Sequence, residues 1–227
     1  MNEARHGARA SLPALNAQRE NGEAVIAGTS DYKATGWHSR GYLPHFDAGE
    51  VFQSITFRLS DSMPQELLMK WKAELARKSE QVEDKLRWKV EAYLDQGCGA
   101  CHLANAHIAN MVENALLNFD GERYRLSAWV LMPNHVHLLV APCYARSLSD
   151  FMHSLKSYTA QEANKHLGRK GRFWFEDYFD RYIRNARLFE NALSYIENNP
   201  VRARLCPSAS EWRFGSAWHR KHMPLSG

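Results

Sequence analysis

The sequence predicts an α+β fold, in which an antiparallel sheet carries helices packed against it. Residues 51–59 alternate β-branched and aromatic residues with polar ones, as strands do. Two further apolar runs, 124–131 and 135–140, are separated only by Met132-Pro133-Asn134, which is typical of a hairpin closed or bulged at the proline. Helical patterns lie between and after these strands. The resulting order of elements predicts a ferredoxin-like sandwich with the 135–140 strand at its centre.

The first half of the chain supplies an extension, a strand and two helical segments. Residues 1–45 are rich in small and polar residues without a sustained period, so we expect a flexible or irregular N-terminal extension. The domain is predicted to span residues 46–215. After Pro64, apolar residues recur at helical spacing as far as Leu94, which predicts a long charged helical segment that ends near Gly97. A second helical stripe runs from Ile108 to Leu116.

The second half supplies a helix, a strand and a final helix. Ser147 or Ser149 is the expected N-cap of a helix that continues to Leu167. The aromatic segment 173–183 is predicted to be a strand. Residues 188–198 are predicted to be helical until Asn199-Pro200 stops them, and 216–227 are expected to be a C-terminal tail.

Composition limits the class of protein. A hydrophobic content of 44% with 11% aromatic residues excludes global disorder. The net charge of +4 is uneven, because residues 156–227 hold 13 Lys and Arg against 7 Asp and Glu. A basic second half fits a phosphate-bearing partner, although solvated surface charge is the alternative. There is no apolar run of membrane-spanning length and no apolar leader, so we expect a cytoplasmic protein without a membrane partner.

The four cysteines are expected to be reduced thiols. Cys98-Gly99-Ala100-Cys101-His102 matches the short pattern for c-type haem attachment, but that chemistry needs export. A zinc finger is disfavoured because no second close Cys/His pair stands at finger spacing.

Two histidines stand one residue apart on the predicted central strand. Side chains at i and i+2 of a strand point to the same face, so His135 and His137 project side by side. Two imidazoles placed in this way can share one divalent metal ion. The alternative is a strand with one polar face.

Tyr158 lies on the helix that follows the histidine strand. In a split β-α-β layout this helix packs back across the sheet, so its inner face can approach the histidines. Phe151, Leu155 and Tyr158 fall at i, i+4 and i+7, which places Tyr158 on or beside the apolar face. The alternative is a boundary residue with a solvated hydroxyl.

Four blocks occur in a recognisable order: Met132–Leu139, Lys156-Ser157-Tyr158, Phe173-Trp174 with Tyr178–Arg184, and Tyr195–Val201. Together they resemble the REP-associated tyrosine transposases, which belong to the single-tyrosine HUH transposases, where U is any apolar residue. The segments Tyr42–Phe46 and Gln53–Leu59 are similar to the N-terminal region of that family. The resemblance covers roughly residues 40–215.

The resemblance implies a metal-dependent single-strand DNA endonuclease and strand transferase that acts beside hairpin DNA of the REP type. Tyr158 is then the nucleophile, and it forms a covalent 5′-phosphotyrosine with a free 3′-hydroxyl. His135 and His137 are implied to hold Mg²⁺ or Mn²⁺. Related enzymes take an oxygen ligand from the tyrosine helix, about one turn on, which points to Glu162 or to its rival Gln161. The absence of a glycine-rich phosphate loop agrees with rejoining that needs no ATP.

Basic and aromatic residues beside the predicted nucleophile and after Gly168 are the expected DNA contacts. The cationic candidates for phosphate binding are Lys156, Arg169, Lys170, Arg172, Arg181 and Arg184. Trp174 and Phe173 could stack on unpaired bases, although a buried role for Trp174 is the alternative.

Two competing functions remain open at the level of sequence. A domesticated relative could bind hairpin DNA without cleaving it, but such a protein has no chemical need for the two histidines and Tyr158. A metallo-hydrolase of small phosphate esters is disfavoured by the basic, aromatic second half. Both a monomer and a homodimer fit the sequence.

Overall fold

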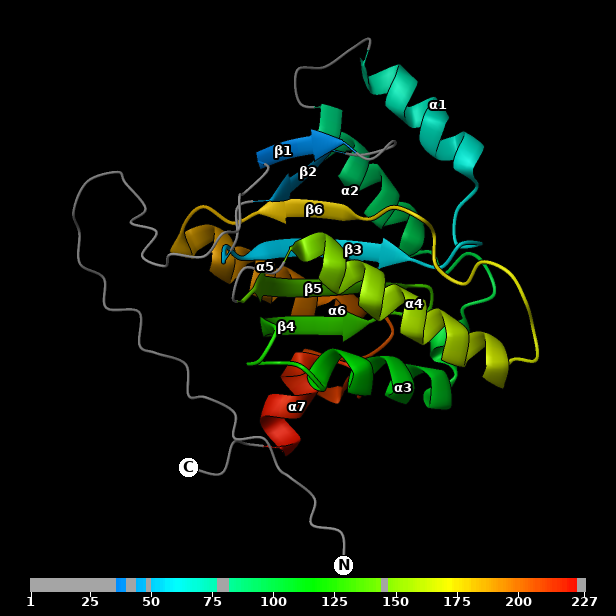
Figure 1. Cartoon of the computed structure of the whole chain (residues 1–227), viewed down its shortest axis with the longest axis vertical. Helices are drawn as coiled ribbons and strands as arrows, with labels where there is room; N and C mark the ends of the chain where they lie inside the picture. The colour runs from blue at the N-terminus through cyan, green and yellow to red at the C-terminus, as the bar shows by residue number, and fades with distance from the viewer. Residues whose placement is uncertain (1–35, 40–43, 48–49, 77–81, 144–146, 224–227) are drawn as a thin grey trace, which may run out of the picture.

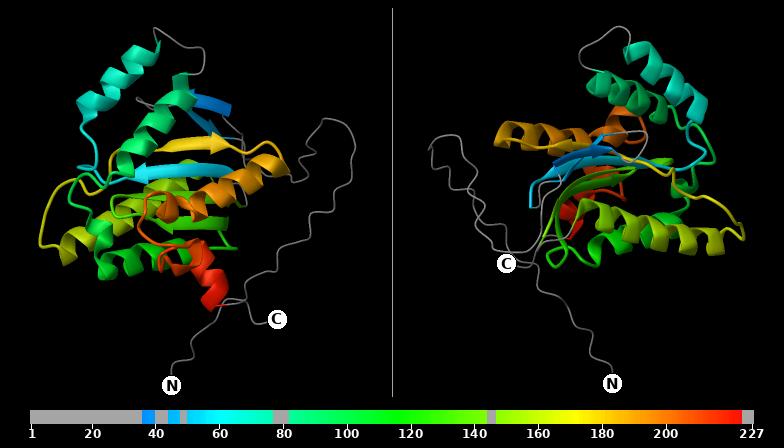
Figure 2. Two further views of the ribbon diagram at one scale, coloured as in Figure 1. Left: turned by 180° about the vertical axis from the view of Figure 1, so that it is seen from behind. Right: turned by 45° about the horizontal axis from the view of Figure 1, so that its top comes forward.

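The computed structural model describes residues 36–39, 44–47, 50–76, 82–143 and 147–223. Its centre is an antiparallel sheet in the order β4-β5-β3-β6, with helices on both faces (Figures 1 and 2). The strands are β3 (Gln53–Arg58), β4 (Tyr124–Leu131), β5 (His135–Pro142) and β6 (Phe179–Tyr182). The first and third of them in chain order lie at the centre of the sheet, as in a ferredoxin-like fold. The predicted α+β sandwich with the histidine pair on a central strand is therefore confirmed.

The hairpin of β4 and β5 forms as predicted, with its turn at Pro133. The amide of Met132 donates to the carbonyl of His135 over 2.9 Å and closes the turn. All eight residues of β5 are buried. Because side chains alternate along a strand, the side chains of β5 pack into two separate buried layers, one on each face of the sheet.

One face of the sheet is covered by α3 (Ala106–Leu117) and α4 (Leu148–His166), which lie below the sheet in the right-hand view of Figure 2. Ser147 caps α4, since its hydroxyl accepts from the amide of Asp150. Val136, Leu138 and Val140 of β5 share one apolar core with residues of both helices. The crossover helix α4 therefore packs on the apolar side of β5.

The other face is covered by α2 (Val82–Leu94), α5 (Ala186–Glu197) and the short α6 (Asn199–Arg202), seen in front of the sheet in the left-hand view of Figure 2. Leu139 of β5 packs here against Ile196 of α5. His135 and His137 have the same alternation as Leu139, so they face α2 and α5. The predicted helical segment after Pro64 is divided into α1 (Gln65–Ala76) and α2, which bury Leu68 against Leu86 and Val90.

Three boundaries differ from the sequence prediction. Within the predicted N-terminal extension, β1 (Gly36–Ser39) pairs with β2 (Pro44–Asp47), and residues 1–35 lie outside the described part. The predicted tail contains α7 (Ser216–His222), because the Ser216 hydroxyl is held by Glu197 and by the amide of Trp129. The predicted strand 173–183 is reduced to β6. Two 3₁₀ turns complete the described elements, η1 (His102–Ala104) and η2 (Ala209–Glu211).

The shortening of that strand has a packing cause. Phe173 and Trp174 are consecutive, yet both are almost fully buried in the core between the sheet and α4. A regular strand would send them to opposite faces. Trp174 therefore forms only an isolated bridge with Leu59, and regular pairing with β3 begins at Phe179.

None of the described helices is long and apolar enough to cross a membrane. The four cysteines are free thiols, as expected.

Candidate active site

The two histidines of β5 form the centre of the site. Both side chains are completely buried, and their Nε2 atoms lie 3.0 Å apart. Burial is the main cause that lowers the pKa of each, for His137 to about 3, with a further contribution from Arg87 and Arg202. Both imidazoles are therefore neutral at pH 7, which is the form that binds metals.

Neighbouring side chains fix which ring nitrogen of each histidine carries the hydrogen. The amide nitrogen of Asn134 donates to the carbonyls of Leu94 and Cys98, so its oxygen faces His135 and accepts from Nδ1 at 2.7 Å. The hydroxyl of Thr56 donates to Glu91 over 3.4 Å and accepts from Nδ1 of His137 at 2.8 Å. Each Nε2 atom is thus left with a lone pair directed at the other.

This arrangement fits a divalent metal ion. Two lone pairs 3.0 Å apart repel each other in a buried site, and a shared cation turns that repulsion into attraction. Neighbouring ligands of an octahedral ion with bonds of about 2.1 Å at right angles are themselves about 3.0 Å apart. Among the described residues, no group of three or more His, Cys, Asp or Glu side chains lies close enough to hold a metal.

Two further polar side chains with unsatisfied atoms lie on this side of the sheet. Asn199, at the start of α6, is fully buried, and neither its amide oxygen nor its amide nitrogen has a hydrogen-bond partner. Asp95, just after α2, places Oδ1 3.8 Å from Nε2 of His135, and that oxygen also lacks a hydrogen-bond partner. Burial raises the pKa of Asp95 to about 6, opposed by the charge of Arg202. A buried amide without partners is costly, so Asn199 is a candidate to complete a metal site.

The aromatic residue beside the histidines is Tyr195 of α5. Its ring meets His137 edge-on, with centroids 5.7 Å apart. Its hydroxyl donates to Oε2 of Glu91 over 2.7 Å, and the guanidinium of Arg202 lies 4.6 Å from its ring centroid. Burial and the charge of Glu91 raise the pKa of this phenol. Asn199 follows Tyr195 by four residues and begins the next helix, α6.

The predicted nucleophile Tyr158 is not brought to the histidines. It is 55% exposed on α4, and α4 covers the face of the sheet opposite to the one from which His135 and His137 project. The expectation that the inner face of α4 approaches the histidines is wrong, because that face packs on the apolar side of β5. The predicted ligand Glu162 lies on the same helix, in a surface pocket with His107 and His166, and Gln161 is exposed.

The predicted base-stacking residue Trp174 is also not available. It is 3% exposed, and its indole nitrogen donates to Thr159 of α4 over 2.9 Å. Phe173 is buried as well. The alternative of a core role, noted for Trp174 from the sequence, therefore holds for both residues.

The predicted cationic contacts fall into two groups. Lys156 and Arg169 are engaged in the fold: Lys156 donates to the carbonyl of Glu176 over 2.6 Å, and Arg169 bonds His102 and the carbonyl of Arg172. Burial lowers the pKa of Lys156 to about 8. The exposed cationic side chains are Lys170, Arg172, Arg181 and Arg184. Arg181 pairs across the strands with Ser54, whose hydroxyl accepts from Arg87 of α2, so it belongs to the histidine side of the sheet.

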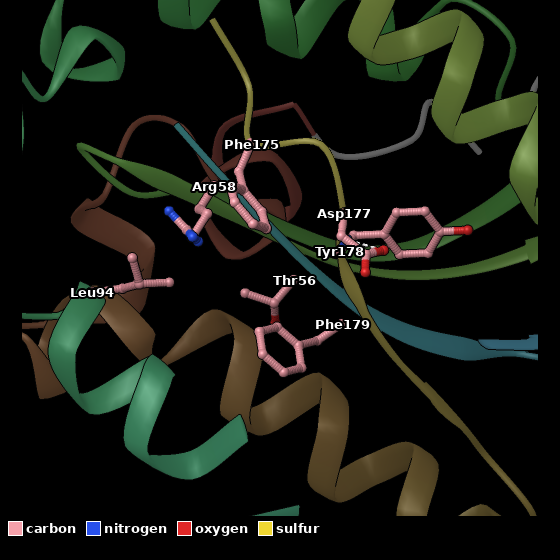
Figure 3. Close-up of a pocket in the computed structure, with 7 residues that line it drawn as sticks. All are labelled: Thr56, Arg58, Leu94, Phe175, Asp177, Tyr178 and Phe179. Carbon is pink, nitrogen blue, oxygen red and sulfur yellow. Dashed lines mark hydrogen bonds between the residues drawn. The ribbon is translucent and has the colours of Figure 1, made fainter. Parts of the chain in front are cut away.

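A small pocket between β3 and β6 adjoins this site (Figure 3). Thr56, which bonds His137, lines it together with Arg58, Leu94, Phe175, Asp177, Tyr178 and Phe179. Arg58 is the cross-strand neighbour of His135, and it is 3% exposed. Its guanidinium stacks 3.8 Å from the centroid of Phe175 and donates to Ser62 and to the carbonyl of Met63. Burial lowers the pKa of Arg58 to about 10, so it stays charged at neutral pH.

Sequence reasoning missed Tyr195, Asn199 and Glu91. The signal for the first two was their place in the block Tyr195–Val201, which is one of the four blocks that carry the resemblance. Glu91 lies in a highly charged helical segment in which nothing distinguishes it from its exposed neighbours. Only the packing of α2 against β3 and α5 reveals that its side chain is buried.

Comparisons with known proteins show what this chain is similar to. Residues 103–199 match the model of the family described as "Transposase IS200 like". The REP-associated tyrosine transposase of Escherichia coli (strain K12) is 26% identical over 111 residues, which cover 48% of this chain and 64% of that protein. The match thus spans less than two thirds of the relative. A solved structure of a REP-associated tyrosine transposase bound to a REP hairpin is 17% identical, with a TM-score of 0.45 over 84% of this chain and 87% of that chain.

The matched residues 103–199 include the histidine strand and α5, and the curated relative points to the same kind of protein. Together they confirm the resemblance of this part of the chain to the REP-associated tyrosine transposases.

Proposed function

We propose that this protein is a metal-dependent single-strand DNA endonuclease and strand transferase, and that its nucleophile is Tyr195. The observation that carries the proposal is the common location of the histidine pair and one phenol. His135, His137 and Tyr195 share one face of the sheet, whereas Tyr158 lies on the other. A nucleophile has to reach the phosphate that the metal site binds, and only Tyr195 of these two tyrosines meets that condition.

The metal would be held by Nε2 of His135, Nε2 of His137 and the amide oxygen of Asn199. A bound Mg²⁺ or Mn²⁺ supplies Lewis-acid polarisation of the scissile phosphate. The residues around it hold the ligands in place: Asn134 and Thr56 orient the two rings, and α6 places Asn199. Arg202 adds a positive charge next to the phenol, where negative charge gathers during attack.

The covalent step exchanges one phosphorus–oxygen ester bond for another. The Tyr195 oxygen attacks phosphorus, its proton leaves the phenol, and the bond from phosphorus to the 3′ oxygen breaks. The departing strand takes a proton from water and ends in a 3′-hydroxyl, while the other strand ends in a 5′-phosphotyrosine. A second 3′-hydroxyl reverses the step and joins a new strand, so no nucleotide cofactor is consumed.

The proposed substrate is single-stranded DNA that carries a REP-like hairpin, as the resemblance implies. The exposed arginines Arg172, Arg181 and Arg184 supply sequence-independent phosphate contacts. Base stacking cannot come from Phe173 or Trp174, which are buried. An aromatic contact, if DNA binding uses one, has to come from another surface.

A matched pair of conservative variants tests the proposal. Each protein is incubated with a hairpin oligonucleotide and Mn²⁺, and the covalent protein–DNA adduct is detected in a denaturing gel. We expect Tyr195→Phe to abolish the adduct and Tyr158→Phe to form it at the wild-type level, because only the first removes the hydroxyl at the histidine site. Loss of the adduct in Tyr158→Phe alone would contradict the assignment. Hairpin binding by the wild type without any adduct would favour a binding protein.

A further inference from the structure

We propose that the carboxylate of Glu91 orients the Tyr195 hydroxyl and accepts its proton as the oxygen attacks phosphorus. This inference rests on the proposed function, since it assigns the partner of the proposed nucleophile. It names a residue of α2, which lies outside the part of the chain that matches the transposase family.

The geometry divides the two oxygens of the carboxylate between two tasks. Oε2 accepts from the Tyr195 hydroxyl over 2.7 Å. Oε1 accepts from Nε of Arg87 over 2.9 Å and from the Thr56 hydroxyl over 3.4 Å. Oε1 is thus held by Arg87 and Thr56, and Oε2 is left to the phenol. This fixes the carboxylate with respect to the atom that reacts.

Burying the charged carboxylate of Glu91 costs desolvation free energy, which a purely structural role does not explain. Glu91 is 6% exposed, and its neighbours on the inner side of α2 include Leu86, Val90 and Leu94. A buried charge is retained only where hydrogen bonds and a countercharge compensate its desolvation. The Arg87 pair supplies that countercharge, yet a leucine at this position would extend the apolar stripe without any such requirement. The hydrogen bond to the phenol is the contact that an apolar residue cannot replace.

The same network joins the nucleophile to the histidine pair. Thr56 donates to Glu91 and accepts from His137, so hydrogen bonds run from Tyr195 through Glu91 and Thr56 to His137. These four residues come from α5, α2, β3 and β5. Glu91 therefore sets the position of α5, and of its tyrosine, relative to the strand that carries the histidines.

The proton balance is simple in both directions. In cleavage, the phenol proton moves to Oε2 of Glu91 as the bond from oxygen to phosphorus forms, and the carboxylate becomes a carboxylic acid. In strand joining, the oxygen of a 3′-hydroxyl bonds to phosphorus and its proton leaves to water, the bond from the tyrosine oxygen to phosphorus breaks, and Glu91 returns its proton to the leaving phenolate. Arg87 and Arg202 stabilise the negative charge that is shared between the carboxylate and the phenol.

Glu91→Gln separates proton acceptance from packing, because its amide oxygen can still accept a hydrogen bond but cannot take the proton. Single-turnover adduct formation is measured with saturating hairpin oligonucleotide and Mn²⁺, and DNA affinity is measured separately by fluorescence anisotropy. We expect the maximal rate to fall by about 10²-fold or more while the Kd for DNA stays unchanged. Glu74→Gln, an exposed glutamate on α1, is the matched control and should retain the wild-type rate.

The outcomes distinguish this inference from the proposed function. If the wild type forms its adduct on Tyr195 and Glu91→Gln forms it at the same rate, the role of Glu91 is overturned and the function stands. If the wild type forms no adduct on Tyr195, the proposed function itself fails, and the role of Glu91 fails with it. Should Glu91→Gln unfold, Glu91→Asp is tested: it keeps the proton acceptor at a greater distance, and an unchanged rate in that folded variant would also overturn the role.

Discussion

At the level of single residues, two hydrogen bonds decide what the histidine pair can do. Asn134 and Thr56 hold the Nδ1 hydrogens of His135 and His137, and this leaves both Nε2 lone pairs in the narrow space between the rings. Partners of this kind are what distinguish a metal site from two histidines that merely satisfy each other. The affinity of this site for a metal ion can be measured without any DNA.

We therefore expect Thr56→Val to weaken Mn²⁺ binding by about 10- to 100-fold, because His137 loses the acceptor that fixes its tautomer. Titration calorimetry on the free protein measures the affinity. Thr159→Val is the matched control: this threonine lies on α4, where it accepts from Trp174, on the opposite side of the sheet. It should lower stability and leave Mn²⁺ affinity unchanged. Equal Mn²⁺ affinity in Thr56→Val and in the wild type would rule out the proposed role of the ring orientation.

At the level of elements, the face on which each helix packs decides the identity of the nucleophile. The residues of α4 that are buried follow a stripe of Leu148, Met152, Leu155, Thr159 and Ala163. Tyr158 lies about 100° around the helix from Thr159, so it turns to solvent. Tyr195 of α5 lies one position before the buried Ile196 and points to the histidines and Glu91 instead.

The last helix belongs to the fold as well, which yields a prediction on stability. Glu197 is buried, and its partners Ser216 and Arg220 both come from α7. Glu113, also buried, accepts from His219 of the same helix. A chain that ends at Gly215 should lose roughly 3–5 kcal/mol of unfolding free energy in urea titrations, because the buried Glu197 loses both of these partners, while Glu113 loses His219 but keeps Trp129 and Arg213. A chain that ends at Met223 keeps these contacts and serves as control. Equal stability of the two chains would show that α7 is dispensable.

The strands β3, β4 and β5 and the histidine pair could be predicted from the sequence, because a period of two and a Pro-containing turn are local signals. The tyrosine that lies beside the histidines, Tyr195, could not be predicted. Val136, Leu138 and Val140 are the apolar alternates of β5, and the crossover helix packs on that side. The two histidines therefore face away from α4, and this orientation depends on how the helices pack on the whole sheet. Glu91 depends on the packing of α2 against two other elements, and no local pattern reports such packing.

At the level of the whole molecule, charge should govern affinity for DNA. Arg181 and Arg184 are exposed, and Arg181 lies on the histidine side of the sheet. We expect the double substitution Arg181→Ala and Arg184→Ala to weaken hairpin binding and to reduce the slope of log K against log salt by about one to two. Anisotropy titrations at several salt concentrations measure this. Arg169→Ala, in which the arginine contacts His102 and a carbonyl, should leave the slope unchanged.

The geometry of the site also predicts which form of DNA is cleaved fastest. A hairpin with an unpaired flank can present its phosphate to the half-buried Tyr195, whereas in a perfect duplex the second strand and the stacked bases restrict access. Matched hairpin, unstructured and duplex oligonucleotides should therefore be cleaved in that order of decreasing rate, and EDTA should abolish cleavage of all three. Faster cutting of the duplex would contradict the proposed substrate.

The central claim, that Tyr195 and not Tyr158 carries the covalent bond to DNA, is tested most directly by locating the adduct. The adduct is digested with trypsin and nuclease, and the modified peptide is identified by mass spectrometry. Cleavage after Lys and Arg yields the peptide 188–202, in which Tyr195 is the one tyrosine, and the peptide 157–165, in which Tyr158 is the one tyrosine. We predict a nucleotide on 188–202 and an unmodified 157–165. A nucleotide on 157–165 would contradict the account.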